Sequence, residues 1–344
     1  MKLNATGPVR MKDIARDLGL SVVTVSKVFR GHQDISPETR QRVLERLTQL
    51  NYRPNHAARS LATGRSYTMA FVAPDLVHPF FSEVAKQVAA VLRGHGYYLL
   101  MSSSDEEPEI ENQEIEHLLT RSIDALLMAS AQPNSDRLRP LLDRKLPLIL
   151  IDRNFPDLGV HFVGVDDRIA GMMATEHLIE QGCRKIAHIT VPSISTSVGR
   201  FDGYKRALRA AELDFDSSYV FTRVHGDSTA DETGYEAMKR LLALRPRPDG
   251  VFCQNDPTAM GAMKAILEAG LRIPDDVAVV GCGNIRYSDF LRIPLTTIDQ
   301  NCEEIGRRAA ELAIRVLNGD RDPRSILLEP KLIVRDSSLR HRSA

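Results

Sequence analysis

Several features that mark other classes of protein are missing from this 344-residue sequence. No apolar run approaches the ~18 to 20 residues that a membrane-spanning helix needs, and the longest, such as LPLILI at residues 146–151, suit buried strands. The N-terminal residues contain no apolar segment typical of a secretory signal. The four cysteines form no CxxC pair, which argues against a disulfide framework or a zinc site. We therefore expect a cytoplasmic protein with no membrane contact, no cofactor and no metal ion.

Catalytic motifs are also missing. The sequence contains no GxSxG, no Walker loop and no HExxH, and it shows no Cys–His or paired-carboxylate arrangement beyond chance. Its histidines are dispersed, and His78 beside Pro79 is the one placed to line a cleft. These observations predict that the protein is not an enzyme.

Charge is present but unevenly distributed. The whole chain has 45 Lys and Arg against 45 Asp and Glu, yet residues 1–66 contain 12 basic and 5 acidic residues. The remainder therefore contains 33 against 40, which makes it acidic. A small basic region joined to a large acidic one is typical of a nucleic-acid-binding module attached to another domain.

The pattern of the basic region predicts short helices. The first is expected over about residues 11–18 and ends at Gly19, where the chain takes a left-handed turn. Ser21 is a natural N-cap for a second helix, whose buried side we expect to be Val25, Val28 and Phe29. Two short helices joined by a glycine turn form a helix-turn-helix. The outward stripe of the second helix, made of methyl, hydroxyl and cationic groups, suits the major groove of DNA and consists of Val23, Ser26, Lys27 and Arg30.

Two further helices complete this region. Ser36 caps a third helix that starts at Pro37, and its inward residues are expected to be Val43, Leu44, Leu47 and Leu50. Pro54 ends it, and a short fourth segment runs from Asn55 to Gly64 with one large apolar residue, Leu61. So short a helix is marginal in water. It is either a plain linker helix or a segment that DNA orders, with Leu61 wedged between base pairs of the minor groove.

The stretch MKDIARDLGLSVVTVSKVF and the following SPETRQRVLERLTQLNYRPNHAARSLATGRS resemble the headpiece and hinge of the lactose-repressor (LacI/GalR) family of bacterial transcription regulators. The resemblance implies that Val22, Val23 and Lys27 lie where the family reads operator bases, and that Leu61 is the intercalating leucine. Lys27 stands where many members have arginine, so a single flexible cation replaces a bidentate fork. The full set of predicted DNA contacts is Ser21, Val22, Val23, Thr24, Ser26, Lys27, Arg30, Asn55, Ala58 and Leu61.

Apolar strand-like runs alternate with helical patterns through the remaining residues. TMAFVAP, YLLMSSSD, DALLMAS, LPLILIDR, HFVGVDD, KIAHITVP, GVFCQND and VAVVGCG are such runs. The alternation predicts an α/β fold with parallel sheets and helices on both faces, and some 275 residues favour two lobes. Polar or small residues follow the strands, where open α/β sheets bind ligands.

The resemblance to the family extends to about residue 340 and implies a two-lobed, periplasmic-binding-protein-like body with an effector in the cleft. The matching stretches are PDLVHPFFSEVAKQV, VGRFDGYKRAL and NDPTAMGAMKAILEAGLRIPDDVAVVGCGN followed by PLTTIDQ. It implies three crossings between the lobes, near residues 165, 295 and 327. The expected organisation is a headpiece (1–54), a hinge helix and linker (55–66), and an effector-binding and dimerisation domain (67–340) with an N-lobe (67–165, 296–326) and a C-lobe (166–295, 327–340).

The resemblance places Arg200 where the family's effector-binding arginine reaches its ligand. The other predicted effector contacts are Asp75, Phe80, Phe81, Asp152, Asn255, Asp256 and Gly283. Alternatives stay open for several of them. Asp256 is equally suited to capping the helix that starts at Pro257. Asp152 is equally suited to holding a loop at the end of its strand, and one of the two phenylalanines is expected in the core.

The sequence Gly281-Cys282-Gly283-Asn284 departs from the Gly-Phe-Asp-Asp or Gly-Phe-Asp-Asn of many members. Gly283 replaces an aspartate that often contacts sugar hydroxyls, which favours an anionic or bulkier effector, so a sugar, an acidic sugar or a sugar phosphate is expected. The resemblance implies a ligand-responsive repressor that binds a near-palindromic operator as a homodimer. No leucine heptads follow the last strand, which argues against a tetramer. The alternative is a cytosolic solute-binding sensor without operator specificity.

Overall fold

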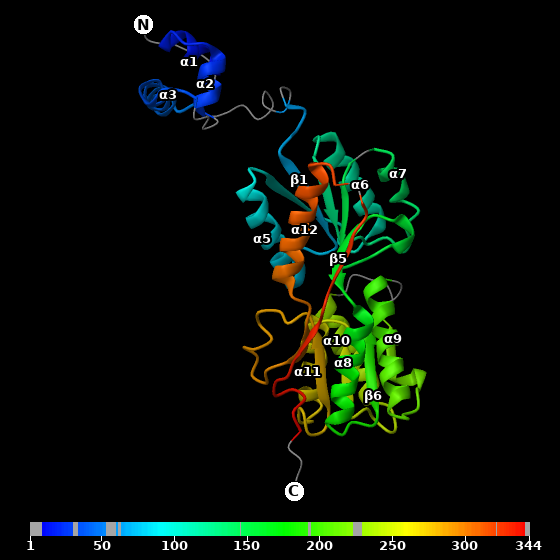
Figure 1. The fold of residues 1–344 in the computed structure, drawn as a ribbon. Coiled ribbons are helices and arrows are strands. Elements are labelled where there is room, and N and C mark those ends of the chain that lie inside the picture. The colour runs from blue at the N-terminus through cyan, green and yellow to red at the C-terminus, as the bar shows by residue number, and fades with distance from the viewer. Residues whose placement is uncertain are drawn as a thin grey trace. The chain divides into compact units, whose positions relative to one another are not determined.

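The computed structural model describes residues 9–29, 34–52, 60, 63–144, 146–191, 194–222, 229–320 and 322–340. The chain divides into two compact units, Met1–Ser66 and Tyr67–Ala344, whose elements are labelled in Figure 1. Four of the predicted DNA contacts lie outside the described residues, namely Arg30, Asn55, Ala58 and Leu61.

The first unit contains the helices α1 (Met11–Leu18), α2 (Val22–Phe29) and α3 (Pro37–Gln49). Gly19 ends α1 in the left-handed conformation at φ 66°, because glycine has no Cβ to oppose it. The caps form as predicted: the Ser21 Oγ accepts a hydrogen bond from the Thr24 N–H at 3.0 Å, and the Ser36 Oγ accepts one from Thr39 at 3.3 Å. The core consists of Ile14, Ala15, Val25, Val28, Val43 and Leu47.

Two expectations for this core were wrong. Phe29 is 43% exposed and Leu44 is 47% exposed. Phe29 is the last residue of α2, where the ring of Tyr52 packs against it edge-on at 6.1 Å. A unit as small as this one buries few positions, so a residue next to the core stripe remains partly in water.

The second unit contains two α/β lobes, each built on a six-stranded sheet. The N-lobe consists of β1 (Thr68–Ala73), α5 (Pro79–Gly94), β2 (Tyr98–Ser103), α6 (Pro108–Thr120), β3 (Ala125–Met128), α7 (Arg139–Leu142), β4 (Leu148–Ile151), η1 (Pro156–Leu158), β5 (His161–Val165), α12 (Cys302–Leu317) and β11 (Ser325–Leu328). Its strand order is β11-β5-β4-β3-β1-β2, and every pairing is parallel.

Helices cover both faces of the N-lobe sheet, which is why its strands read as continuous apolar runs. Met69 and Phe71 of β1 point to one face and pack with α5 and α12, which lie side by side in Figure 1. Ala70 and Val72 of the same strand point to the other face and pack with α6 and α7. This alternation within one strand separates the two hydrophobic clusters of the lobe.

The C-lobe has the same layered architecture. It consists of α8 (Asp167–Glu180), β6 (Ile186–Thr190), α9 (Ser195–Ala210), η2 (Ser217–Tyr219), β7 (Val220–Thr222), α10 (Ala230–Leu242), β8 (Gly250–Cys253), α11 (Asp256–Glu268), β9 (Ala278–Cys282), β10 (Thr296–Asp299) and β12 (Lys331–Ile333). The strand order is β12-β10-β9-β8-β6-β7. We expected parallel sheets, but the edge strand β12 pairs antiparallel with β10, so this sheet is mixed.

The chain crosses between the lobes at residue 166, at residues 300–301 and at residues 329–330. Assigning residues 296–299 to the N-lobe was therefore wrong, because β10 pairs with β9 in the C-lobe sheet. The third crossing also lies slightly later than the predicted residue 327. Thr296 and Thr297 are fully buried, and their hydroxyls are satisfied by groups of the C-lobe, which keeps this polar strand in that sheet.

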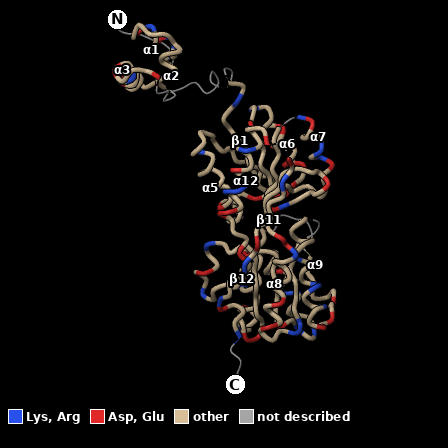
Figure 2. Tube along the Cα trace, in the orientation of Figure 1, with Lys and Arg blue, Asp and Glu red and all other residues tan. Residues whose placement is uncertain are grey.

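Basic and acidic residues are interspersed along the second unit, without a long block of one sign (Figure 2). Within the part of the chain that the structure describes, no helix has both the length and the apolar character needed to cross a membrane.

Candidate functional site

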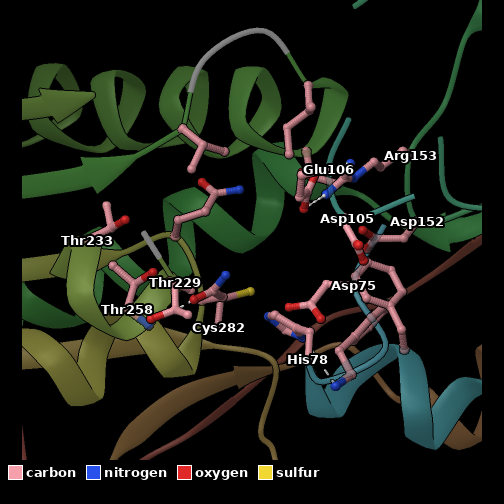
Figure 3. Close-up of a pocket in the computed structure, with 18 of the residues that line it drawn as sticks. Asp75, His78, Asp105, Glu106, Asp152, Arg153, Thr229, Thr233, Thr258 and Cys282 are labelled. Carbon is pink, nitrogen blue, oxygen red and sulfur yellow. Dashed lines mark hydrogen bonds and ion pairs between the residues drawn. The ribbon is translucent and has the colours of Figure 1, made fainter. Parts of the chain in front are cut away.

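A cavity of about 450 Å³ lies between the two lobes and is lined by residues of both (Figure 3). Its lining follows the carboxyl ends of the strands: Asp75 after β1, Asp105 after β2, Asp152 after β4, Asn255 after β8 and Cys282 at the end of β9. Six of the eight predicted effector contacts line it, namely Asp75, Phe80, Phe81, Asp152, Arg200 and Asn255. A cavity of this volume suits a small polar ligand.

Arg200 is held on the C-lobe side of the cavity by fixed contacts. It lies in α9 and is 4% exposed. Its Nε donates to the Asp167 Oδ1 at 2.8 Å, and its Nη1 donates to the Gln254 carbonyl at 2.6 Å. Burial raises the pKa of Asp167 to about 7, against the opposing charge of Arg200. The guanidinium is thereby oriented before any ligand binds.

Two glycines bring α8 and α9 close enough for this contact. A Cβ on Gly171 of α8 would lie 2.1 Å from the Arg200 carbonyl oxygen, and a Cβ on Gly203 of α9 would lie 2.1 Å from the Arg168 carbonyl oxygen. Real Cβ atoms essentially never approach within 3.0 Å. The helix pair can therefore pack this closely only because both positions are glycine.

Asp152 lies at the end of β4 with a left-handed backbone at φ 63°. It is 8% exposed, and its Oδ1 accepts a hydrogen bond at 3.1 Å from the Gln300 Nε2 in the second crossing. Burial raises its pKa, while the nearby guanidinium groups of Arg200 and Arg153 oppose the shift. Asp152 thus both holds the crossing and lines the cavity, so the two interpretations of this residue are compatible.

Phe80 and Phe81 start α5 and are 3% and 4% exposed. Their rings pack edge to face, with centroids 5.1 Å apart. Both belong to the N-lobe core and both line the cavity, so neither has a purely structural position. His78 precedes them, and its Nδ1 accepts a hydrogen bond from the Phe80 N–H at 3.3 Å. Burial lowers the pKa of His78 to about 4, which leaves it neutral near pH 7.

Asp256 does not line the cavity, so assigning it to effector binding was wrong. It is fully buried and accepts hydrogen bonds from the Ile285 N–H at 2.9 Å, the Ser288 hydroxyl at 2.7 Å and the Thr297 hydroxyl. These contacts tie the residue 285–288 loop and β10 to the start of α11. Asn255 is the helix cap instead, since its Oδ1 accepts from the Thr258 N–H at 2.9 Å, and it also lines the cavity.

Gly283 also lies outside the lining, and its neighbour Cys282 contributes to it. The prediction of an anionic effector depended on a carboxylate missing at Gly283. The structure places the Asp167 carboxylate directly on Arg200, so the arginine does not lack a negative partner. That argument for an anionic ligand is therefore removed.

Sequence reasoning missed several lining residues of the N-lobe. Asp105 and Glu106 follow β2 and both have positive φ, at 50° and 60°. Arg153 is 5% exposed and makes a two-pronged contact with Glu106, at 2.8 and 2.6 Å (Figure 3). The run SSSDEEP directly after a strand was a usable signal, because it matches the rule that identified Asp75 and Asp152.

The described residues of α2 include three of the four residues of the predicted stripe, namely Val23, Ser26 and Lys27, and none of the three is fully buried. Val22 and Val23 are 45% and 65% exposed, which is unusual for valines of a helix whose other face is buried. Lys27 is half exposed and pairs with Asp34. Ser21 is exposed, and Thr24 and Ser26 are partly exposed. An exposed apolar and cationic stripe on a helix after a tight turn has the chemistry required for the major groove.

Within the described residues, no group of three or more His, Cys, Asp or Glu side chains is arranged to hold a metal ion.

Comparisons with known proteins agree with this architecture. Residues 10–55 match the family described as bacterial regulatory proteins, lacI family, and residues 175–338 match a periplasmic binding protein-like domain. An HTH-type transcriptional repressor named PurR from Mannheimia succiniciproducens is 33% identical over 331 residues, which cover 95% of this chain and 98% of the relative. Catabolite control protein A from Priestia megaterium is 30% identical over 327 residues, covering 94% and 97%.

Solved structures give the same result. A complex of the transcriptional regulator CelR with cellobiose has a TM-score of 0.72 at 30% identity, and the match covers 96% of this chain and 99% of that chain. A lac repressor dimer bound to operator and the anti-inducer ONPF has a TM-score of 0.86 at 24% identity, covering 97% and 100%. The second likeness shows the shared fold. PurR and CelR are both named as regulators of transcription.

Proposed function

This chain belongs to the lacI family of bacterial regulatory proteins, and on that premise we propose that it is a homodimeric transcription repressor of the cytoplasm. Its affinity for a near-palindromic operator depends on a small polar effector. The observation that carries the proposal is the presence, on one chain, of a helix-turn-helix with an exposed apolar and cationic stripe and of a two-lobed cleft around a buried arginine.

In this proposal, residues 1–54 read the operator, residues 55–66 form the hinge, and residues 67–340 bind effector and a second subunit. The α2 residues enter the major groove, where the Val22 and Val23 methyls contact thymine methyl groups and Lys27 contacts a base edge or phosphate. Ser21, Thr24, Ser26 and Arg30 support this contact, and Asn55, Ala58 and Leu61 act in the minor groove.

The effector binds between the lobes, with Arg200 and Asn255 on one side and Asp75 and Asp152 on the other. The two phenylalanines beside the cavity supply an apolar face for a sugar ring. A carbohydrate-related ligand is further supported by the regulator solved with cellobiose. Ligand binding changes the orientation of the lobes and hence the affinity for DNA by linkage, whether the ligand acts as inducer or corepressor.

Exposed apolar residues of the second unit support a homodimer. Tyr98 and Met101 are 61% and 37% exposed on β2, an edge strand of the N-lobe sheet, and Tyr287 and Phe290 are 60% and 79% exposed in the C-lobe. Exposed large apolar side chains and the unpaired edge of a sheet are both features of surfaces that a partner covers. A second copy of the chain covers them in a two-fold dimer, which matches the symmetry of a palindromic operator.

The proposal is tested by incubating the full-length protein with a pool of randomised duplexes and sequencing the retained DNA, with and without candidate effectors. A near-palindrome of about one and a half to two helical turns is the expected result. Deleting residues 1–66 should abolish retention and leave ligand binding intact. If no duplex is retained under any condition, the repressor proposal is wrong and a cytosolic solute sensor takes its place.

A further inference from the structure

The two walls of the cleft differ in charge. Among the described lining residues, the N-lobe wall has five carboxylates and one guanidinium, whereas the C-lobe wall has Arg200 and no carboxylate. Figure 3 shows the acidic side chains grouped on one side of the cavity, opposite the hydroxyl groups of Thr229, Thr233 and Thr258. The acidic residues are Asp75, Asp105, Glu106, Glu107 and Asp152.

Asp75 and Asp105 are among the carboxylates of the N-lobe wall that form no ion pair within the described part of the chain. Asp75 accepts a hydrogen bond from the Val77 N–H at 2.7 Å, and Asp105 accepts one from the Ser103 hydroxyl at 2.5 Å, but no Lys or Arg of that part pairs with either. The guanidinium on this wall, that of Arg153, is engaged by Glu106. His78 beside Asp75 is neutral near pH 7, because burial lowers its pKa to about 4. The wall therefore attracts positive charge.

The C-lobe wall presents donors instead. The Nε and Nη1 of Arg200 are engaged, while its Nη2 has no hydrogen-bond partner among the described residues, although the side chain is nine-tenths buried and lines the cavity. The helices α9, α10 and α11 all begin at this wall, after the uncharged caps Ile194, Thr229 and Asn255. Helix N-termini carry partial positive charge. Helices α5 and α6 likewise begin at the N-lobe wall, but five carboxylates outweigh their positive ends there, whereas the C-lobe wall has no carboxylate and therefore requires acceptor atoms from the ligand.

We propose that the cleft selects an effector with a protonated amine directed at the Asp75 and Asp105 wall and oxygen acceptors directed at Arg200. This refines the effector proposed above and rests on that function. An amino sugar has this chemistry, and a cavity of about 450 Å³ accommodates one. Opposite polarity of the walls also fixes the orientation of the ligand, because reversing it places like charges in contact.

The polarity of the walls can be measured without knowing the ligand. Ile110 and Ile194 are both partly buried, line opposite walls and lie near helix N-termini, so Ile110→Cys and Ile194→Cys are matched reporter variants. Each is treated with ethylammonium and ethylsulfonate methanethiosulfonates, and the ratio of cationic to anionic modification rates cancels the intrinsic reactivity of each thiol. The wild-type protein, whose four cysteines are buried, gives the background rate.

The cation preference at Ile110→Cys should exceed that at Ile194→Cys on the order of tenfold. Adding Asp75→Asn and Asp105→Asn should remove most of this difference, with the ratio at Ile194→Cys little changed. Melting curves confirm that each variant is folded. Equal ratios at the two positions, or a larger cation preference at Ile194→Cys, would overturn the proposal.

A second measurement addresses the ligand itself. The melting temperature of the full-length wild-type protein is compared with D-glucose, D-glucosamine and D-glucuronate, and with the corresponding galactose series. An aminated sugar should give the largest rise within its series, and a larger rise from a neutral or carboxylated member contradicts the proposal. If no sugar shifts the melting temperature, the reporter ratios decide alone. Neither measurement involves DNA. If the operator selection fails while the modification ratios at Ile110→Cys and Ile194→Cys differ as expected, the repressor function is refuted and the proposed cleft chemistry is retained.

Discussion

Substituting Gly171 with alanine should destabilise the C-lobe, although the added group is a single methyl that lies outside the cleft. The new Cβ would lie 2.1 Å from the Arg200 carbonyl oxygen, whereas ordinary van der Waals contacts of a Cβ lie at 3.4–4 Å and distances under 3.0 Å essentially never occur. That oxygen must therefore retreat by at least about 0.9 Å, and by about 1.3 Å or more to restore ordinary contact. The obstacle is backbone, which cannot rotate away as a side chain can. Helix α9 must therefore move away from α8 and carry Arg200 with it.

The expected cost follows from two opposing effects. Overpacking a tight contact costs about 1–3 kcal/mol, with backbone obstacles at the upper end. Alanine in place of a helical glycine returns up to about 1 kcal/mol through helix propensity. The net loss in the free energy of unfolding should be about 2 kcal/mol, which lowers the melting temperature of a unit of this size by roughly 4–8 °C.

Gly94→Ala is the matched control, because Gly94 ends α5 in ordinary helical conformation and no atom outside its own helix lies within 4 Å of the methyl that alanine would add. That substitution should be neutral or stabilise by up to about 1 kcal/mol. Thermal and urea unfolding measure the melting temperature and the free energy of unfolding of the two variants and of the wild type. If Gly171→Ala and Gly94→Ala shift the melting temperature equally, the close α8–α9 contact does not exist as described.

Three further results are expected. Asp256→Ala should lower the free energy of unfolding by about 3–5 kcal/mol in urea titrations, because three buried donors lose their acceptor; a loss below about 1 kcal/mol would contradict this structural role. The folded pKa of Asp167, about 7, lies above its unfolded value, so its contribution to stability is present below about pH 4 and is lost as the pH rises to 7. The stability of wild type relative to Asp167→Asn should therefore fall over that window by up to about 4 kcal/mol, and a flat difference would place the pKa elsewhere. Lys27→Ala should weaken operator binding by about 1–3 kcal/mol per headpiece in competition assays at fixed salt, and an equal loss on random DNA would make it a phosphate contact only.

The layered fold could be predicted because parallel strands covered on both faces leave continuous apolar runs in the sequence. Strand β10 could not be assigned to the correct lobe from its residues alone. Its Thr296 and Thr297 are polar, yet both are fully buried, since Thr296 exchanges hydrogen bonds with Arg335 and Thr297 donates to Asp256. These partners are 39 to 41 residues away in the chain. Local sequence patterns do not reveal hydrogen bonds between residues so far apart in the chain.

The same limit applies to the candidate site. The position of Asp152 after an apolar strand was enough to place it in the cleft, and the resemblance placed Arg200 there. Asp256 has an equally suggestive position, but it points to Ser288 and to β10 and not into the cavity. Which way such a side chain points depends on a loop that comes some 30 residues later, so the sequence supports both orientations.

The threefold passage of the chain between the lobes has a consequence for synthesis on the ribosome. The N-lobe core contains Ile305 and Ala309 of α12, and its sheet ends with β11 at residues 325–328, so this lobe is incomplete until nearly the whole chain has emerged. At ~5–20 residues per second, the roughly 160 residues after β5 take about 8–32 s to translate. During that interval the apolar surface that α12 will cover remains open, so nascent chains depend on chaperones or on rapid completion to avoid aggregation.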